Sequence, residues 1–370
     1  MFRQSTSLIY RWISGILSVL LFVPLIGYIW TGFYSRYLQD DYCYATFLRG
    51  ENFFTVQWNS YFHASSYSAN RYSLTLMMGI SEEIGRFTVS LLPGLMVILF
   101  VAGFMVLFRQ ISRLVQVKLD PVEYLMLSAA IVQLVLYQAP NRTQILYWRA
   151  GMLPYLAPLV TLVWTIAWVI WKGYEKRGGV LSVIGLFLLS FLSAGFSETG
   201  AVYQAGFLGI AFVSALIASR KKQSNERQFL FPLSIALAGT FLGIIVLVLS
   251  PVNKVRMTNI YLETQSFVEL ITITADSLIQ YVQYLLYRVT LPTFFAFLLF
   301  TAFGWVFFLR YKRPTCLSFR KLVFFLFGIQ AIHLILIFLE MAPNVYAMSS
   351  APTARALLAA RFTTVITTAI

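Results

Sequence analysis

Long apolar runs separated by short polar breaks constrain this chain more than any other feature. About 20 apolar residues are enough to cross a bilayer as a helix, which satisfies its own backbone hydrogen bonds in lipid. With 59% hydrophobic residues, the chain has too little polar surface for a soluble protein. It is therefore predicted to be an all-α, polytopic transmembrane protein. The expected spans are residues 12–30, 87–108, 122–138, 152–171, 180–195, 201–218, 229–250, 292–309 and 322–340.

The two ends of the chain extend this pattern. The first apolar run is longer than a signal-peptide core and has no small-x-small cleavage motif, so we expect it to stay as a helix. The last stretch, TARALLAARFTTVITTAI, begins an apolar helix that is expected to be a tenth span. It stops without a cap, as expected if the chain is cut short there. Residues 1–370 are thus expected to form a single transmembrane domain with about nine to ten spans.

Positive charge is distributed as membrane topology requires. The formal net charge is +14, but the basic residues cluster in short connections between apolar runs, which argues against a nucleic-acid partner. By the positive-inside rule these connections are cytoplasmic. We expect a multi-pass protein of the plasma (inner) membrane, with a cytoplasmic N-terminus and an extracytoplasmic site. The basic connections carry Arg3 and Arg11; Arg109, Arg113 and Lys118; Lys172, Lys176 and Arg177; Arg220, Lys221, Lys222 and Arg227; and Arg310, Lys312, Arg313, Arg320 and Lys321.

Two of the expected outer loops are long. Residues 31–86 form the first, where we expect short helices, one of them starting at Asp40 or Asp41, because Asp is a favoured N-cap residue. Residues 251–291 form another outer loop, in which apolar positions recur at helical spacing but Glu269 and Asp276 interrupt them. A span there would also place RYKRP outside, against the charge rule. We therefore expect an amphipathic helix lying at the outer interface.

Every outer loop brings polar or charged side chains to the end of an expected span. A charge inside the hydrocarbon costs at least ~2.5–3.5 kcal/mol, and the cost falls near the interface, so any single one of these residues is also explained as an interface group. Acids and arginines in all the outer loops favour one shared site. Its candidates are Asp40, Asp41, Arg71, Tyr147, Trp148, Arg149, Tyr155, Glu198, Asn253, Arg256 and Arg355.

These residue types suit a phosphate-bearing lipid and a group transferred from it. A carboxylate can act as general base, and the pair Asp40 and Asp41 can hold a divalent cation such as Mg or Mn. Arginine binds phosphate oxygens in bidentate fashion, and aromatic rings can stack on a sugar. Adjacent residues point about 100° apart on a helix, so the two aspartates should do different jobs. Which of them is the base stays open, with Asp40 preferred.

The order of these motifs resembles the multi-pass GT-C glycosyltransferases, and more narrowly the bacterial membrane families of O-antigen glucosyltransferase type. The resemblance rests on the acidic pair after the first span, NRY with Arg71, YWRAGMLPY, SE after the fifth span, PVNKVR after the seventh and PTAR near the end. Three positions depart from the family pattern: Asn70 replaces a frequent Gly, Ser197 replaces a frequent Asn, and PVN replaces PGN. These departures weaken the resemblance to the O-antigen glucosyltransferase families more than the resemblance to the GT-C superfamily.

The resemblance implies an activity and roles for several residues. The expected reaction moves a hexose from a polyprenyl-phosphate donor to a cell-envelope glycan or lipid acceptor, such as lipopolysaccharide, with inversion at the anomeric centre. Asp40 or Asp41 would deprotonate the acceptor hydroxyl, with or without a metal ion. Arg256 and Arg355 would neutralise the departing lipid phosphate, and Glu198 would hydrogen-bond the sugar or the acceptor.

Three other functions stay open. A transporter or flippase of lipid-linked saccharides also needs arginines, but its charges should lie near mid-membrane, whereas here they concentrate at the outer ends of the spans. An O-antigen ligase or polymerase also uses outer-loop arginines, but its key loop typically comes late in the chain. A structural assembly subunit is disfavoured by the acidic pair within a long loop.

Overall fold

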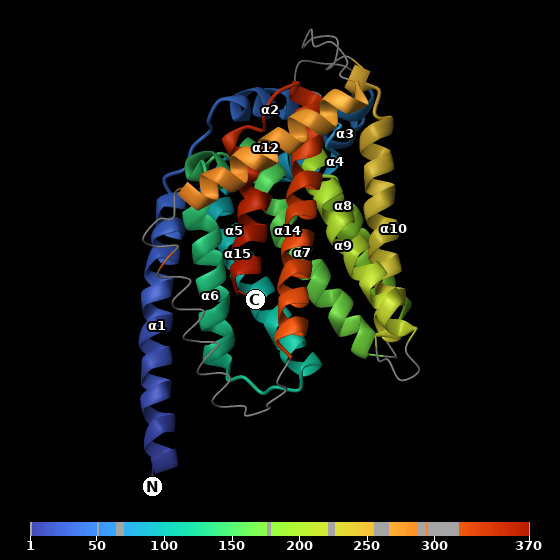
Figure 1. Ribbon diagram of the computed structural model, residues 1–370. Helices are drawn as coiled ribbons and strands as arrows, with labels where there is room; N and C mark the ends of the chain where they lie inside the picture. Colours follow the sequence, from blue (N-terminus) through green and yellow to red (C-terminus); the bar gives the residue numbers. More distant parts are fainter. Residues whose placement is uncertain are drawn as a thin grey trace.

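The computed structural model describes residues 2–49, 52–63, 70–175, 179–220, 226–254, 266–287, 294 and 318–369. All regular elements in these ranges are helices, so the predicted all-α class is confirmed for them (Figure 1). Seven of the described helices include segments long and apolar enough to cross a membrane, as a multi-pass membrane protein requires. They are α1 (Phe2–Gly32), α5 (Thr88–Leu114), α6 (Pro121–Gln138), α7 (Arg149–Tyr174), α9 (Glu198–Ser219), α10 (Arg227–Leu249) and α14 (Phe319–Met348).

The remaining expected spans have different outcomes. Helix α8 (Val180–Ala194) is apolar but has 15 residues, fewer than the ~20 of a full span. The span expected at 292–309 lies outside the described residues except for Phe294. The apolar helix expected near the end is present as α15 (Leu358–Ala369).

Local sequence signals explain where several helices begin. Pro121 occupies the first turn of α6, and the backbone N–H of Asp120 donates to the Glu123 carboxylate at 2.6 Å, as in a capping box. At α9, the Ser197 hydroxyl accepts the N–H of Gly200 at 3.1 Å. This second cap matters for the site, because it fixes the first residue of α9, Glu198, at the end of the helix.

Helix α7 lies at the centre of the bundle. Its apolar side chains pack with Phe100 and Phe104 of α5 and with Val132 and Leu136 of α6 in the largest buried cluster. Helix α10 packs on α8 through a small-residue surface that includes Gly239. A Cβ atom there would lie 2.4 Å from the backbone oxygen of Phe187, so only glycine permits this approach.

Short helices gather at the end of the bundle opposite the N-terminus, which we call the distal end (Figure 1). Between α1 and α5 the chain forms α2 (Asp40–Arg49), α3 (Phe53–Phe62) and α4 (Tyr72–Ile84). Helix α12 (Phe267–Tyr287) crosses obliquely over the ends of the long helices. The irregular helices η1 (Thr143–Tyr147) and η2 (Ala354–Leu357) precede α7 and α15. Of the candidate site residues, Asp40 and Asp41 lie in α2, Tyr147 in η1 and Arg355 in η2, and Arg71 directly precedes α4.

Candidate functional site

The two neighbouring aspartates at the start of α2 have opposite environments. Asp40 is exposed, and its carboxylate has no hydrogen bond or ion pair with any described residue. Asp41 is fully buried and accepts the backbone N–H groups of Leu38 and Ala150, each at 3.1 Å. Burial raises the pKa of the Asp41 carboxyl. The two residues therefore have different surroundings, and the expectation that they do different jobs stays a prediction.

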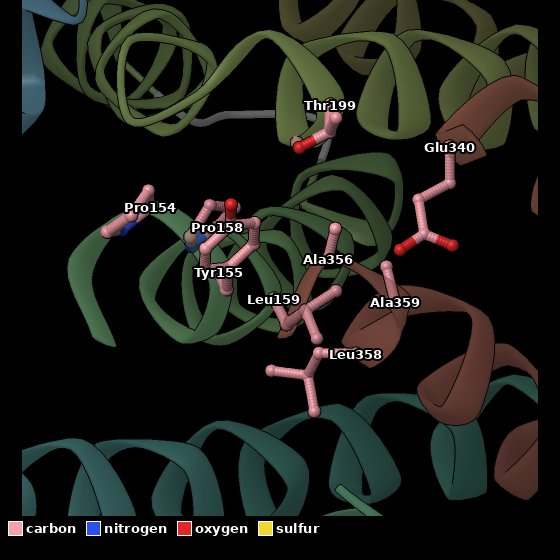
Figure 2. Close-up of a pocket in the computed structure, with 10 residues that line it drawn as sticks. Pro154, Tyr155, Pro158, Leu159, Thr199, Glu340, Ala356, Leu358 and Ala359 are labelled. Carbon is pink, nitrogen blue, oxygen red and sulfur yellow. The ribbon is translucent and has the colours of Figure 1, made fainter. Parts of the chain in front are cut away.

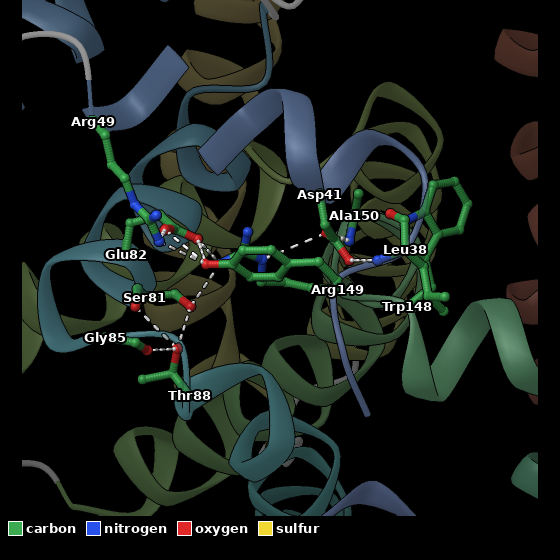
Figure 3. Close-up of polar contacts among 11 residues, drawn as sticks. Leu38, Asp41, Arg49, Ser81, Glu82, Gly85, Thr88, Trp148, Arg149 and Ala150 are labelled. Carbon is green, nitrogen blue, oxygen red and sulfur yellow. Dashed lines mark hydrogen bonds and ion pairs between the residues drawn. The ribbon is translucent and has the colours of Figure 1, made fainter. Parts of the chain in front are cut away.

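Asp41 belongs to a buried ionic cluster built around Arg149, the first residue of α7 (Figure 3). The side chain of Arg149 is 1% exposed, and its Nε lies 3.5 Å from Oδ1 of Asp41. Its Nη1 donates to Glu82 Oε1 at 2.7 Å and to Ser81 Oγ at 2.9 Å. The guanidinium carbon lies 5.1 Å from the centre of the Tyr37 ring. Arg149 thus ties α2, α4 and α7 together.

Glu82 collects three donors in this cluster. Tyr37 donates its hydroxyl at 2.7 Å, and Arg49 donates Nη2 at 2.7 Å, in addition to Arg149. Burial alone would raise the pKa of Glu82, but the hydrogen bonds from Tyr37 and Arg149 outweigh it and lower the pKa. Two carboxylates thus balance two guanidinium groups, and the cluster holds the first loop on the bundle.

A second ion pair joins the end of the first loop to α9. Arg71 donates from Nε and Nη2 to the same oxygen of Glu198, both at 2.8 Å, and Asn70 donates to the other oxygen at 2.8 Å. Burial works to lower the pKa of Arg71, but the charge of Glu198 outweighs it and the pKa is raised. Tyr155 is near enough to act on Arg71 in the same direction. Glu198 therefore points to the end of the bundle with its charge already paired.

Arg355 is held by aromatic rings instead of carboxylates. Its guanidinium carbon lies 5.0 Å from the ring centre of Trp148 and 6.0 Å from that of Tyr155. Its Nε is buried and has no hydrogen-bond partner among the described residues. Trp148 is itself fixed, because its indole N–H donates to the Leu38 carbonyl at 2.9 Å. Arg355 is partly buried, and a guanidinium with an unpaired donor is suited to an anionic group such as a phosphate.

Glu340 was not among the predicted site residues. It lies in α14, it is 1% exposed, and neither carboxylate oxygen has a hydrogen bond of normal geometry to a described residue. It lines a small cavity of about 10 Å³ with Tyr155 and Thr199. Figure 2 shows the carboxylate pointing toward Ala359 at the start of α15, where a helix dipole favours negative charge. An acid inside an apolar run is itself a signal of function, and it could have identified this residue.

The structure places the other predicted residues apart from this group. Tyr147 is half-buried and its hydroxyl faces the backbone oxygen of Tyr28 in α1, at 3.4 Å. Asn253 donates to the carbonyls of Leu247 and Val248 and so closes the end of α10. Arg256 lies outside the described residues. Trp148, Tyr155 and Arg355 therefore form the centre of the candidate site, with Arg71, Glu198 and Glu340 around it.

The acidic pair does not fit a divalent cation in this arrangement. Both Asp41 oxygens already face N–H donors, and a cation there would lie beside the buried guanidinium of Arg149. Asp40 alone can offer a free carboxylate. Among the described residues, no group of three or more His, Cys, Asp or Glu side chains is arranged to hold a metal ion.

Comparison of the chain with family models, curated proteins and solved structures finds no match in any of the three. The function is therefore inferred from the arrangement of the site. Three of its properties matter most: the ring-held Arg355, the unpaired carboxylate of Asp40 and the buried carboxylate of Glu340.

Proposed function

We propose that the chain is a GT-C-like membrane glycosyltransferase that moves a sugar from a polyprenyl-phosphate donor to a cell-envelope glycan or lipid acceptor. The observation that carries this proposal is Arg355, held against Trp148 and Tyr155 with Nε unpaired. In this proposal the protein lies in the plasma (inner) membrane with its N-terminus in the cytoplasm. The distal end then faces the extracytoplasmic side, where such lipid-linked donors are used.

Arg355 is proposed to bind the donor phosphate. The two ring faces fix the guanidinium before any ligand arrives, so little side-chain entropy is lost on binding. Negative charge on the phosphate grows as the sugar leaves, and a preorganised cation stabilises that charge most strongly in the transition state. Arg256 is proposed as a second cation for the same group. The exposed part of Tyr155 offers an apolar face for the sugar ring.

Asp40 is proposed as the general base. The indole N–H of Trp148 binds the carbonyl of Leu38, and two residues span at most about 7 Å, so the backbone of Asp40 is close to the segment that Trp148 contacts. Its carboxylate is exposed and unpaired, whereas Asp41 is committed to Arg149. Asp41 is thus proposed to position α2, and Asp40 to accept the proton.

The proposed reaction is a single displacement. The acceptor hydroxyl oxygen attacks the anomeric carbon while Asp40 takes its proton. The bond from that carbon to the phosphate oxygen breaks, and the bonding electrons leave with the polyprenyl phosphate, whose charge Arg355 neutralises. Attack from the face opposite the leaving group inverts the anomeric centre. Glu198, fixed by Arg71, and Glu340 are proposed to accept hydrogen bonds from sugar hydroxyls.

One observation favours a second function, a transporter of lipid-linked saccharides. Glu340 is a buried carboxylate within a helix long enough to span the membrane, as a transport pathway would need. A transporter would move a labelled polyprenyl-phosphate sugar between the leaflets of a vesicle without cleaving it. Label that crosses the bilayer while the donor stays intact would favour this alternative.

The test of the proposed function is transfer of label from a radiolabelled polyprenyl-phosphate hexose to a cell-envelope lipid extract, using the purified full chain. Asp40→Asn should lower the transfer rate by about 10²–10⁴, the usual contribution of a general base. Glu83→Gln is the matched control, because Glu83 is also exposed in the first loop, and it should leave the rate unchanged. Full activity in Asp40→Asn, or no transfer by the wild type, would refute the proposal.

A further inference from the structure

A larger cavity lies beside α2, away from the Arg355 site. Its volume is about 360 Å³, within the ~300–1,000 Å³ typical of small-ligand sites. It is lined by two arginines, two tyrosines and two small residues: Tyr37, Tyr42, Ala45, Thr46, Arg49 and Arg86. We infer that this cavity binds the phosphate of an anionic phospholipid headgroup, a role separate from the proposed sugar transfer.

The charges around the cavity favour an anion. Arg86 is exposed and has no ion pair or hydrogen bond from its side chain to any described residue. Arg49 uses Nη2 for Glu82 and the Tyr37 hydroxyl, at 2.7 and 3.1 Å, while 42% of its side chain is exposed. The charge of Glu82 is shared with the buried Arg149, so it does not cancel both lining arginines. The cavity therefore keeps an excess of positive charge.

The position of the cavity favours a lipid as the source of the phosphate. Arg86 lies two residues before Thr88, where the spanning helix α5 begins, which is the level of lipid headgroups in a membrane. Exposed aromatic side chains that are typical of the interface lie on the adjoining segments, at Trp30, Tyr42 and Phe87. Tyr42 lines the cavity itself. An acyl chain can thus stay in the bilayer while its headgroup reaches the two guanidinium groups.

The cavity is also distinct from the Arg355 site in its contacts. The residues that line it differ from Trp148 and Tyr155, the two rings that hold Arg355. A lipid bound here would bridge the end of α2 to the start of α5. Since it binds only the folded first loop, it should stabilise the protein as its concentration rises.

The test measures phosphatidylglycerol bound to the purified full chain by native mass spectrometry, with phosphatidylcholine, whose headgroup is zwitterionic with no net charge, as the competitor. The wild type should retain phosphatidylglycerol selectively. Arg86→Gln should weaken this binding about tenfold, the effect of losing one charge-assisted contact, and Arg86→Lys should restore part of it. Arg36→Gln is the matched control, because Arg36 is exposed at the same end but bonds to Phe33, Ser35 and Ser90.

Three results would overturn the inference. Equal retention of both lipids by the wild type would show that the cavity does not select an anionic headgroup. Equal losses in Arg86→Gln and Arg36→Gln would show general surface attraction. Displacement of the lipid by millimolar inorganic phosphate would make the cavity a site for soluble anions. Asp40→Asn should bind phosphatidylglycerol normally, whatever its effect on sugar transfer.

Discussion

Glu82 is the residue on which attachment of the first loop most depends. Its side chain is 3% exposed and pairs with both the buried Arg149 and Arg49. Glu82→Gln leaves Arg149 without its closest charged partner, which should destabilise the protein by about 3 kcal/mol. Thermal unfolding in detergent measures this loss. Glu83→Gln should change stability by less than about 0.5 kcal/mol, because Glu83 is exposed. Equal stability of the two variants would contradict the role given to Glu82.

The lowered pKa of Glu82 predicts that the stability of the fold depends on pH. The folded state lowers the pKa of Glu82 below its ordinary 4.5, so the stability it contributes is present above that pH and is lost as the pH falls further. Asp41 acts in the opposite sense, because burial raises its pKa and protonation removes a buried charge. Melting temperatures between about pH 5 and pH 3 should therefore fall more steeply for the wild type than for Glu82→Gln. Parallel curves would count against this linkage.

Substitution of Glu340 distinguishes a role in sugar transfer from a role in stability. A buried carboxylate with no hydrogen bond of normal geometry costs stability, so Glu340→Leu should leave thermal stability unchanged or raise it. If Glu340 binds a sugar hydroxyl, the same substitution should lower sugar transfer by about tenfold or more, since one hydrogen bond to a charged group is lost. A strongly destabilised Glu340→Leu would instead mean that the carboxylate holds α14 to α15.

The sequence predicted different roles for Asp40 and Asp41, because adjacent side chains on a helix point in different directions. It did not find that Asp41 faces Arg149, since that contact joins segments far apart in the chain and is made only when α2 packs on α7. Glu340 was missed because no motif surrounds it, although an acid in an apolar run is by itself a signal of function. Arg71 and Glu198 were both candidates, but their pairing was not predictable from spacing.

At the scale of the elements, the contact between α8 and α10 depends on Gly239. A methyl group there meets the backbone of Phe187, which cannot move aside as a flexible side chain does. Gly239→Ala should therefore separate the two helices and destabilise the protein by about 1–3 kcal/mol, the usual cost of overpacking. Gly209→Ala is the control, because nothing lies within 4 Å of that position, and it should be neutral or slightly stabilising. Thermal unfolding of both variants measures the difference.

Apolar length predicted most of the long helices, because a run of about 20 apolar residues has few alternatives to a helix in lipid. It did not distinguish α8, whose 15 residues are apolar but too few for a straight crossing of a full bilayer core. Glu269 and Asp276 interrupt the apolar pattern of α12, and this helix crosses over the ends of the long vertical helices (Figure 1). The pattern of apolar residues did not predict which of these helices pack against one another.

At the scale of the whole molecule, segments from both ends of the chain meet at the distal end. The first loop is fixed there by the Arg149 cluster, and η2 brings Arg355 from the C-terminal part onto Trp148. This arrangement gathers polar side chains from distant parts of the chain at one end of a bundle with few charged residues. The positions of these side chains depend on the tertiary fold, whereas most of the residues themselves could be chosen as candidates from the sequence.

The central claim is that the distal end binds a lipid-linked sugar phosphate at Arg355. A photoreactive polyprenyl-phosphate sugar, cross-linked to the full chain and mapped by peptide mass spectrometry, tests it most directly. Label should appear in peptides containing Trp148, Tyr155 or Arg355, should be competed by unlabelled donor, and should fall at least about tenfold in Arg355→Gln, since a charge-assisted contact is lost. Label confined to other helices, or unchanged in Arg355→Gln, would contradict the claim.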